Sequence, residues 1–502
     1  MIGTLGALAR AVGLDVSAVE GRDLLLRSRD ADVPLHLDRL SADRLDLAHI
    51  NAPGTITIRS CVIEELVIDH CTADALLVTN SRIGRLTLRN TPPHCEVALA
   101  DTSVGVLDAH SCGPLRLEDV RVGATLQIAA TRGAVRLTRV RTAALTVRSQ
   151  TVAGRRGRPA VDLAQVHVTE SAVFDDLWLA ALRLREVDTD TLELRRVRLD
   201  APLEGTGVHC RENLRINGMV VPGDAGALAE SSVRGTVEVR GLRRAPALPA
   251  PRRRGRPTPV RTAPPAPPTA PEPLALAFRS STLHRVSLST GEETPLVVGL
   301  DDTVVTEALS LPVGPARFRL SGDSSINEVD LADAVFRGRR QVTQFLEQMF
   351  TRVTPHALEA VRATLARRRR TREEDQLYYY IRQAEAARDH WSRRLLARGL
   401  LGGVFGWGVR ARNPARALVA SILATALALW LAGPLAEPPP AHPATLAGRA
   451  LVMSCALWLN IGVGAPSELK TYPWTGAAVF FTVGGIVFST LTVGIVIRKL
   501  VR

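Results

Sequence analysis

Residues 55–90 read TITIRSCVIEELVIDHCTADALLVTNSRIGRLTLRN, and a pair of apolar residues returns in this stretch every ten positions. The leading members of the pairs are Ile56, Leu66, Leu76 and Leu86, and the residues two positions later are Ile58, Ile68, Val78 and Leu88. Apolar residues at positions i and i+2 lie on one face of a β-strand but on different faces of a helix, so the stretch predicts short strands. We expect both members of each pair to be buried in one core.

Small residues punctuate the same repeat. Five positions after each leading apolar residue comes Cys61, Cys71, Ser81 or Thr91, which places these residues at corners between strands. A repeat this short buries its apolar face only against its neighbours, so successive coils must stack. The pattern continues less regularly to about Val335. We therefore expect a β-solenoid over residues 35–336, preceded by a cap over residues 1–34.

Two basic insertions interrupt the repeat. The first, residues 154–159, is short, whereas the second, residues 243–273, is rich in proline and arginine. This composition predicts a disordered or polyproline-like segment, with a solvated linker as the commoner explanation and a docking motif as the alternative. The repeat resumes at Leu276 and Phe278, so we expect the solenoid to continue beyond the insertion.

Beyond the solenoid, the apolar period becomes helical. We expect three helices, over residues 340–351, 356–369 and 373–399, within a connector that spans residues 337–410. The third helix is basic and contains three consecutive tyrosines, Tyr378–Tyr380. Packing of these tyrosines against the end of the solenoid is favoured over contact with a ligand.

Residues 411–502 contain two long uncharged runs. Residues 417–435 form the first run and residues 474–497 form the second, and the lengths of both suit membrane spans. Between them, residues 450–465 form a shorter apolar run that contains two glycines near its end and is followed by Pro466. A run of this length is short for a span, so we expect a re-entrant segment whose backbone lines a cavity.

Basic residues flank the outer ends of both runs. They are Arg410, Arg412 and Arg416 before the first run, and Arg498, Lys499 and Arg502 after the last. The positive-inside rule places both flanks in the cytoplasm, which requires an even number of crossings. We therefore expect two spans with a dipping loop and cytoplasmic N- and C-termini.

The order of these segments resembles the two-transmembrane pore module of potassium-channel-like proteins. In that family the ion filter reads Thr-Val-Gly-Tyr-Gly-Asp, and the matching positions here are Asn460, Ile461, Gly462, Val463, Gly464 and Ala465. The resemblance implies a pore helix at residues 450–459, a filter-like loop at residues 460–466, and a hinge in the inner helix at Gly484 and Gly485. It also implies four copies around one axis.

Two positions depart from the family pattern. Asn460 stands where the family has threonine, and Ala465 stands where it has the aspartate that anchors the outer mouth. We therefore expect weak discrimination among monovalent cations. The glycines Gly462 and Gly464 keep the family spacing, and glycine permits the dihedral angles that aim carbonyl groups at an ion.

The amino-terminal repeats have a resemblance of their own. A period of ten is two pentapeptides, and the repeats resemble right-handed β-helical and pentapeptide-repeat-like proteins. In bacterial proteins that join such repeats to a pore module, similar helices precede the pore, as do motifs like residues 406–408 and 413–416. The combined resemblance implies a mainly β protein, a right-handed β-helix followed by an α-helical connector and a two-span transmembrane module, in the bacterial inner membrane.

Composition narrows the function. The net charge of +13 falls largely in arginine clusters, and the cluster at residues 367–372, near the first span, favours anionic lipid as its partner. No nucleic-acid-binding motif is present, and the six dispersed cysteines suit reduced thiols in the cytoplasm. The histidines show no metal-binding spacing, and no catalytic motif or cofactor-binding motif is found.

Three hypotheses follow from the sequence. The first is a channel-like pore for monovalent cations, formed by a homo-oligomer in the lipid bilayer with the β-helix in the cytoplasm. The second is a membrane-anchored scaffold whose solenoid docks an unknown protein without conduction. The third, an enzyme, is the least favoured because no catalytic residues were found.

Overall fold

The computed structural model describes residues 23–30, 34–148, 159–245, 273–291, 295–331, 339–352, 354–388, 412–432, 442–459 and 472–501. The chain forms two compact units, Met1–Ala334 with Gln344–Thr364, and Val335–Thr343 with Leu365–Arg502. Residues 154–158 of the first expected insertion and residues 246–272 of the second lie outside the described residues. So do residues 1–22 of the expected cap and residues 389–411 of the connector.

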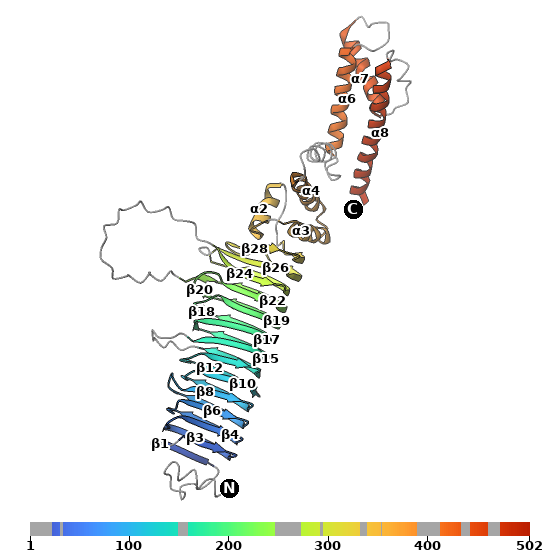
Figure 1. Ribbon diagram of the computed structural model, residues 1–502. Coiled ribbons are helices and arrows are strands. Elements are labelled where there is room, and N and C mark those ends of the chain that lie inside the picture. The colour runs from blue at the N-terminus through green and yellow to red at the C-terminus, as the bar shows by residue number, and fades with distance from the viewer. Residues whose placement is uncertain are drawn as a thin grey trace, which may run out of the picture. The chain divides into compact units, whose positions relative to one another are not determined.

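The first unit is a β-solenoid of about 12 turns. Its strands lie across one axis as a stack that follows chain order (Figure 1). The strands of the first half are β1 (Asp23–Asp30), β2 (His36–Asp38), β3 (Ser41–Asn51), β4 (Thr55–Arg59), β5 (Val62–Asp69), β6 (Ala75–Thr79), β7 (Arg82–Arg89), β8 (Glu96–Ala100), β9 (Ser103–His110), β10 (Leu115–Glu118), β11 (Arg121–Val122), β12 (Thr125–Ala129), β13 (Val135–Thr138) and β14 (Arg141–Arg148).

The second half of the solenoid continues the same stack. Its strands are β15 (Ala160–Asp175), β16 (Trp178–Leu179), β17 (Ala181–Arg195), β18 (Arg198–Leu199), β19 (Leu203–Asn217), β20 (Val220–Val221), β21 (Gly226–Ala229), β22 (Ser232–Arg240), β23 (Arg243–Arg244), β24 (Leu274–Arg279), β25 (Thr282–Ser289), β26 (Leu296–Asp301), β27 (Val304–Leu309), β28 (Ala316–Ser321) and β29 (Ser325–Val329).

Strand pairing shows how the ten-residue period becomes a coil. Ile56 of β4 pairs with Leu76 of β6, and Leu66 of β5 pairs with Leu86 of β7, both in parallel register. The partner of each residue is therefore two periods away along the chain, so one turn contains two of the ten-residue periods. The right-handed sense expected from the resemblance stays a prediction.

The core consists of the expected apolar pairs. Leu66, Ile68, Leu76 and Val78 are at most 1% exposed, which confirms the expected register. Buried positions alternate in steps of two and three residues, as in Ile56, Ile58, Cys61, Ile63 and Leu66. A step of two stays on one strand face, and a step of three crosses a corner. Each turn therefore encloses one continuous apolar interior.

The corners are built from residues that tolerate a left-handed backbone. Ser60, His70 and Asn80 have φ angles of 53°, 52° and 47°, and each precedes a small residue at a corner. The small residues form hydrogen bonds with the preceding turn of the solenoid. Cys71 Sγ, for example, donates a hydrogen bond to Leu47 O at 3.2 Å. These bonds satisfy corner polar groups that point into the solenoid.

The stack keeps its register across the long insertion. Gly226 pairs with Leu276 and Leu228 pairs with Phe278, on opposite sides of the insertion, which confirms that the solenoid resumes where we expected. The expected start of the insertion is wrong by two residues. Arg243 and Arg244 form β23, which pairs with β20, because a long-range ladder can hold residues whose composition is typical of a loop. Strand β1, which pairs with β3, likewise lies within the expected cap.

Two helices close the carboxyl-terminal end of the solenoid, α2 (Arg339–Met349) and α3 (Pro355–Arg367). The ring centroids of Phe318 on β28 and Phe350 lie 6.5 Å apart, and Thr351 N donates a hydrogen bond to Phe318 O at 2.9 Å. On α3, Thr364 Oγ1 accepts a hydrogen bond from Val329 N at 3.0 Å. These contacts cover apolar side chains and pair backbone groups that the last turn would otherwise expose.

The connector helices begin and end close to their expected positions. α2 and α3 each lie within two residues of the expected bounds, and α4 (Thr371–Arg388) covers the described part of the third helix. On α4, Arg382 Nε donates a hydrogen bond to Tyr378 Oη at 3.1 Å. Packing of the tyrosines against the solenoid stays a prediction.

Candidate functional site: the helical module

Three helices form the module that the sequence marks as functional: α6 (Arg412–Ala432), α7 (Pro443–Leu459) and α8 (Tyr472–Val501). α6 and α8 occupy the two runs expected to be spans. α7 contains the expected pore helix, residues 450–459, but begins seven residues before it. The expected start of this helix is therefore wrong.

The backbone explains the early start of α7. Pro443 suits the first turn of a helix, where its missing N–H would have no partner in the helix. His442 O accepts hydrogen bonds from Thr445 N at 3.1 Å and from Thr445 Oγ1 at 2.6 Å. The apolar run begins only at Ala450, but an exposed charge at Arg449 does not interrupt a helix. Apolarity alone therefore placed the boundary too late.

The lengths of the apolar segments differ. Within the described residues, one segment, Gly476–Gly494 of α8, is long and apolar enough to cross a membrane. The apolar parts of α6 and α7, Ala415–Leu431 and Pro443–Leu459, are shorter. The two-span architecture therefore stays a prediction.

The module exposes apolar side chains over all three helices. Of the 21 large hydrophobic residues that are exposed in the described part of the chain, 16 lie on α6, α7 and α8. Phe480 and Val452, for instance, are 71% and 70% exposed. Exposed apolar side chains in this number are typical of a surface that meets lipid or another protein.

α7 is attached to α6 by two polar contacts within an apolar surrounding. Ser454 Oγ, which is fully buried, donates a hydrogen bond to Ile422 O at 2.6 Å. One turn further along α7, Trp458 Nε1 donates a hydrogen bond to Thr425 Oγ1 at 2.9 Å. Polar groups of this kind fix the register of two helices where apolar packing alone is permissive.

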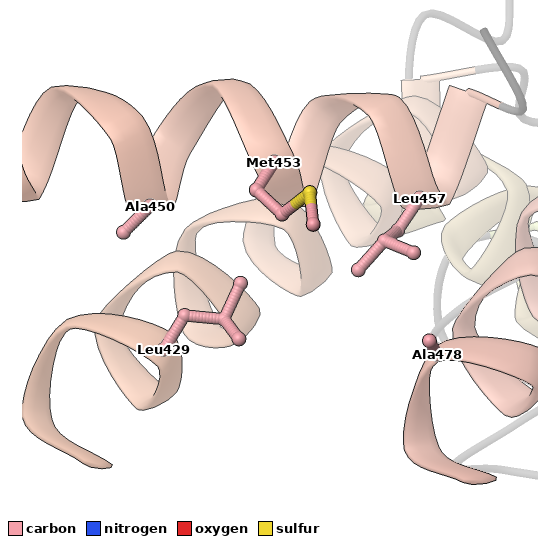
Figure 2. Packing of buried hydrophobic residues seen from close by; sticks show 5 residues of the cluster. All are labelled: Leu429, Ala450, Met453, Leu457 and Ala478. Atoms are coloured by element: carbon pink, nitrogen blue, oxygen red, sulfur yellow. The ribbon is translucent and has the colours of Figure 1, made fainter. Parts of the chain in front are cut away.

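Apolar packing joins α7 to both of its neighbours. Figure 2 shows three residues of α7, Ala450, Met453 and Leu457, with Leu429 of α6 and Ala478 of α8. All five are at most 7% exposed. α7 is therefore held on two sides, by α6 and by α8.

The glycine pair of α8 meets α7 at Trp458. A Cβ atom added to Gly485 would lie 2.0 Å from Trp458 O, and one added to Gly484 would lie 3.3 Å from the indole ring. The same indole contacts Phe481 and Phe488, with ring centroids 5.8 and 5.9 Å away. Glycine thus allows the backbones of α7 and α8 to approach closely. α8 is a continuous helix through this point, and the hinge role of Gly484 and Gly485 stays a prediction.

The expected filter lies outside the described residues. Asn460, Ile461, Gly462, Val463, Gly464 and Ala465 follow directly after Leu459, the last residue of α7. Their role therefore stays a prediction. The described residues that position the end of α7 are Thr425, Ser454 and Trp458, which the sequence reasoning did not single out. The sequence did contain a signal for these residues, because each is a polar or amphipathic side chain within an apolar run.

The solenoid cysteines are buried and unpaired by disulfides within the described residues. No group of three or more potential metal ligands occurs there. Burial raises the pKa of Cys71 and Cys112 to about 11, and that of Cys210 to about 12. Burial therefore favours the protonated form of these thiols over the thiolate.

The chain matches no protein-family model, no curated protein and no solved structure.

Proposed function

We propose that this protein is an integral membrane protein whose helical module forms a channel-like pore for monovalent cations, as a homo-oligomer. The observation that carries the proposal is the position of α7, a short helix held between α6 and α8 that ends directly before the Gly462 and Gly464 pair. The β-solenoid and both termini lie in the cytoplasm, and the membrane is the bacterial inner membrane.

The end of α7 supports this proposal electrostatically. The carboxyl end of a helix carries a partial negative charge, because its last carbonyl groups have no partner in the helix. Residues 460–465 follow that end, so a cation near them experiences a favourable field. The Thr425–Trp458 hydrogen bond and the contact between Gly485 and Trp458 O hold the end of α7 in a defined place.

Cation flux into proteoliposomes tests the proposal. The full-length protein is reconstituted, and uptake of K⁺ and Na⁺ is measured under an imposed ion gradient. We expect both ions to enter, and we expect Gly462→Val or Gly464→Val to abolish the flux without reducing membrane insertion. Gly494→Val is the matched control, because nothing lies within 4 Å of a Cβ at that position. Flux that persists in both filter variants contradicts the proposal.

The second candidate is a membrane-anchored solenoid scaffold that does not conduct. It is favoured by the finding that a single described segment, Gly476–Gly494, reaches spanning length, because an anchor needs no more. The subunit count of the purified protein separates the two. A tetramer with flux supports the pore, whereas a monomer without flux supports the scaffold.

A further inference from the structure

A pocket lies on the outside of the solenoid and shares no residue with the helical module. Its volume is about 970 Å³, which is large enough for a small organic ligand. The pocket follows one corner through four successive turns. Its lining residues are Asp101, Thr102 and Ser103 in the first turn, Asp119 and Arg121 in the second, Arg139 and Arg141 in the third, and Gln165 and His167 in the fourth.

Most polar side chains of this pocket already have partners. Arg139 binds Asp119 through two hydrogen bonds, of 2.6 and 2.7 Å, and Glu118 through a third of 2.9 Å. These bonds lower the pKa of Asp119 and raise that of Arg139, so both stay charged. Gln165 donates a hydrogen bond to Glu186 at 2.9 Å. The pocket wall is therefore fixed before any ligand arrives.

The fourth turn is fixed in the same way. His167 Nδ1 lies 3.0 Å from a carboxylate oxygen of Asp188. The buried hydroxyl of Thr102 donates a hydrogen bond to Ala100 O at 2.7 Å. Thr102 at one end of the pocket and His167 at the other are thus occupied by neighbours in the solenoid.

Two arginines in the middle of the pocket differ from these side chains in their pairing. Arg121 and Arg141 are register partners in adjacent turns, so their side chains leave the surface one strand spacing apart, about 5 Å. In the described part of the chain, no carboxylate or hydrogen-bond acceptor is paired with either guanidinium group. Their like charges repel each other, and an anion between them would remove that repulsion.

The charges of the lining favour an anion over a cation. Three arginines and two aspartates line the pocket, and Asp119 is neutralised by Arg139. The other carboxylate, Asp101, lies in the turn next to that of Arg121 and two turns from Arg141. Ser103 is the register partner of Arg121 in the preceding turn, so Ser103, Arg121 and Arg141 form one column of stacked residues. The hydroxyl of Ser103 supplies a further hydrogen-bond donor for an anion on this column. A tetrahedral phosphate can accept hydrogen bonds from several directions at once, and guanidinium groups match it in geometry.

We propose that this pocket binds a small soluble phosphate-bearing anion, with its phosphate held between Arg121 and Arg141. The pocket volume leaves space for further atoms beside the phosphate. The site stands independently of ion conduction, because it is built from residues of the solenoid alone.

Calorimetric titration with inorganic pyrophosphate tests the site. The full-length protein is held in nanodiscs of zwitterionic lipid, so that no lipid supplies a competing anionic headgroup. We expect saturable binding with a Kd below about 1 mM. Arg121→Gln and Arg141→Gln should each weaken binding about tenfold, since each removes a charge-assisted contact. Both side chains are exposed, so folding should be unchanged, and circular dichroism checks this.

Arg82→Gln is the matched control. Arg82 lies on the same column as Ser103 and is also exposed, but it does not line the pocket. Its replacement should change the Kd less than twofold. Equal losses in all three variants mean that binding is nonspecific attraction to a basic surface, and this result overturns the proposal. So does an absence of pyrophosphate binding at about 10 mM.

A second arm separates a soluble ligand from a lipid headgroup. A short-chain phosphatidylglycerol, added below its micelle concentration, replaces pyrophosphate in the same titration. We expect weaker binding than that of pyrophosphate, because one phosphodiester carries a single charge. Lipid binding that depends on Arg121 and Arg141 in the absence of pyrophosphate binding refutes the soluble ligand.

Discussion

Replacing Gly485 by alanine should separate α7 from α8. The added Cβ would lie 2.0 Å from Trp458 O, whereas side-chain carbons essentially never come within 3.0 Å of such an atom. One of the two helices must therefore move by about 1 Å or more. Overpacking of this kind costs about 1–3 kcal/mol. The helix propensity of alanine offsets at most about 1 kcal/mol of that cost.

A second glycine of the same helix isolates the steric effect. Gly494 also lies in α8, but nothing is within 4 Å of a Cβ added there. Gly494→Ala gains the same propensity without the clash, so Gly485→Ala should be less stable than Gly494→Ala by about 1–3 kcal/mol. At Gly484, where the added Cβ lies 3.3 Å from the indole, alanine should have an intermediate effect.

The assay is reversible unfolding of the full-length protein in mixed micelles, titrated with sodium dodecyl sulfate and followed by tryptophan fluorescence. Equal stability of the Gly485→Ala and Gly494→Ala proteins, within about 0.5 kcal/mol, would refute the close approach of the helices. Cation flux measured on the same proteins addresses the hinge. If Gly485→Ala keeps its stability but loses flux, the residue acts as a hinge and not as a packing residue.

Three further predictions concern the solenoid core, its thiols and the contact between α6 and α7. Leu76→Asp should destabilise the solenoid by more than about 3 kcal/mol, because it buries an unpaired charge at a position that is 1% exposed. Leu77→Asp, on the outward side of the same strand, is the control and should cost less than about 1 kcal/mol. Equal yields of folded protein from the two variants would show that the register is wrong. In a Cys455→Ser background, Ellman's reagent at pH 8 should label the solenoid thiols only after denaturation. Burial raises the pKa of Cys210 to about 12, above the value of about 9 in the unfolded chain. The free energy by which this protonated thiol stabilises the fold is therefore complete below pH 9 and should be lost as the pH rises from 9 towards 12. A stability curve that stays flat over this interval contradicts the burial of Cys210. Trp458→Phe and Thr425→Val should each lower the free energy of unfolding by about 1 kcal/mol. The double variant should lose less than the sum of the two, because both substitutions remove the same hydrogen bond. Strict additivity in the same unfolding assay would mean that the bond does not form.

Much of the solenoid was predictable because its information is local. An inward-facing strand residue is followed two positions later by another, so the sequence alone places Leu66 and Ile68 in the core. The same local pattern located the end of the long insertion at Leu276 and Phe278. Helix periodicity likewise placed α2 and α3 within two residues of their observed bounds.

The helical module was predictable only in part. Apolar runs located α6, α7 and α8, but the start of α7 depends on Pro443 and on the hydrogen bonds to His442 O, which hydropathy does not register. The filter expected at residues 460–465 lies outside the described residues, so its role rests on the resemblance and on the position of α7.

What the sequence by itself determined is which residues face inward, because that property depends on each residue and its near neighbours in the chain. Which residues become partners was decided only by the tertiary structure. The ten-residue period is equally compatible with several coil lengths, and only closure of the coil pairs Ile56 with Leu76, two periods further along the chain. In the same way, Gly485 and Trp458 lie on different helices, and only the packing of α8 against α7 makes that glycine necessary. Long-range pairing depends on how the whole chain fills space, and no local pattern encodes that.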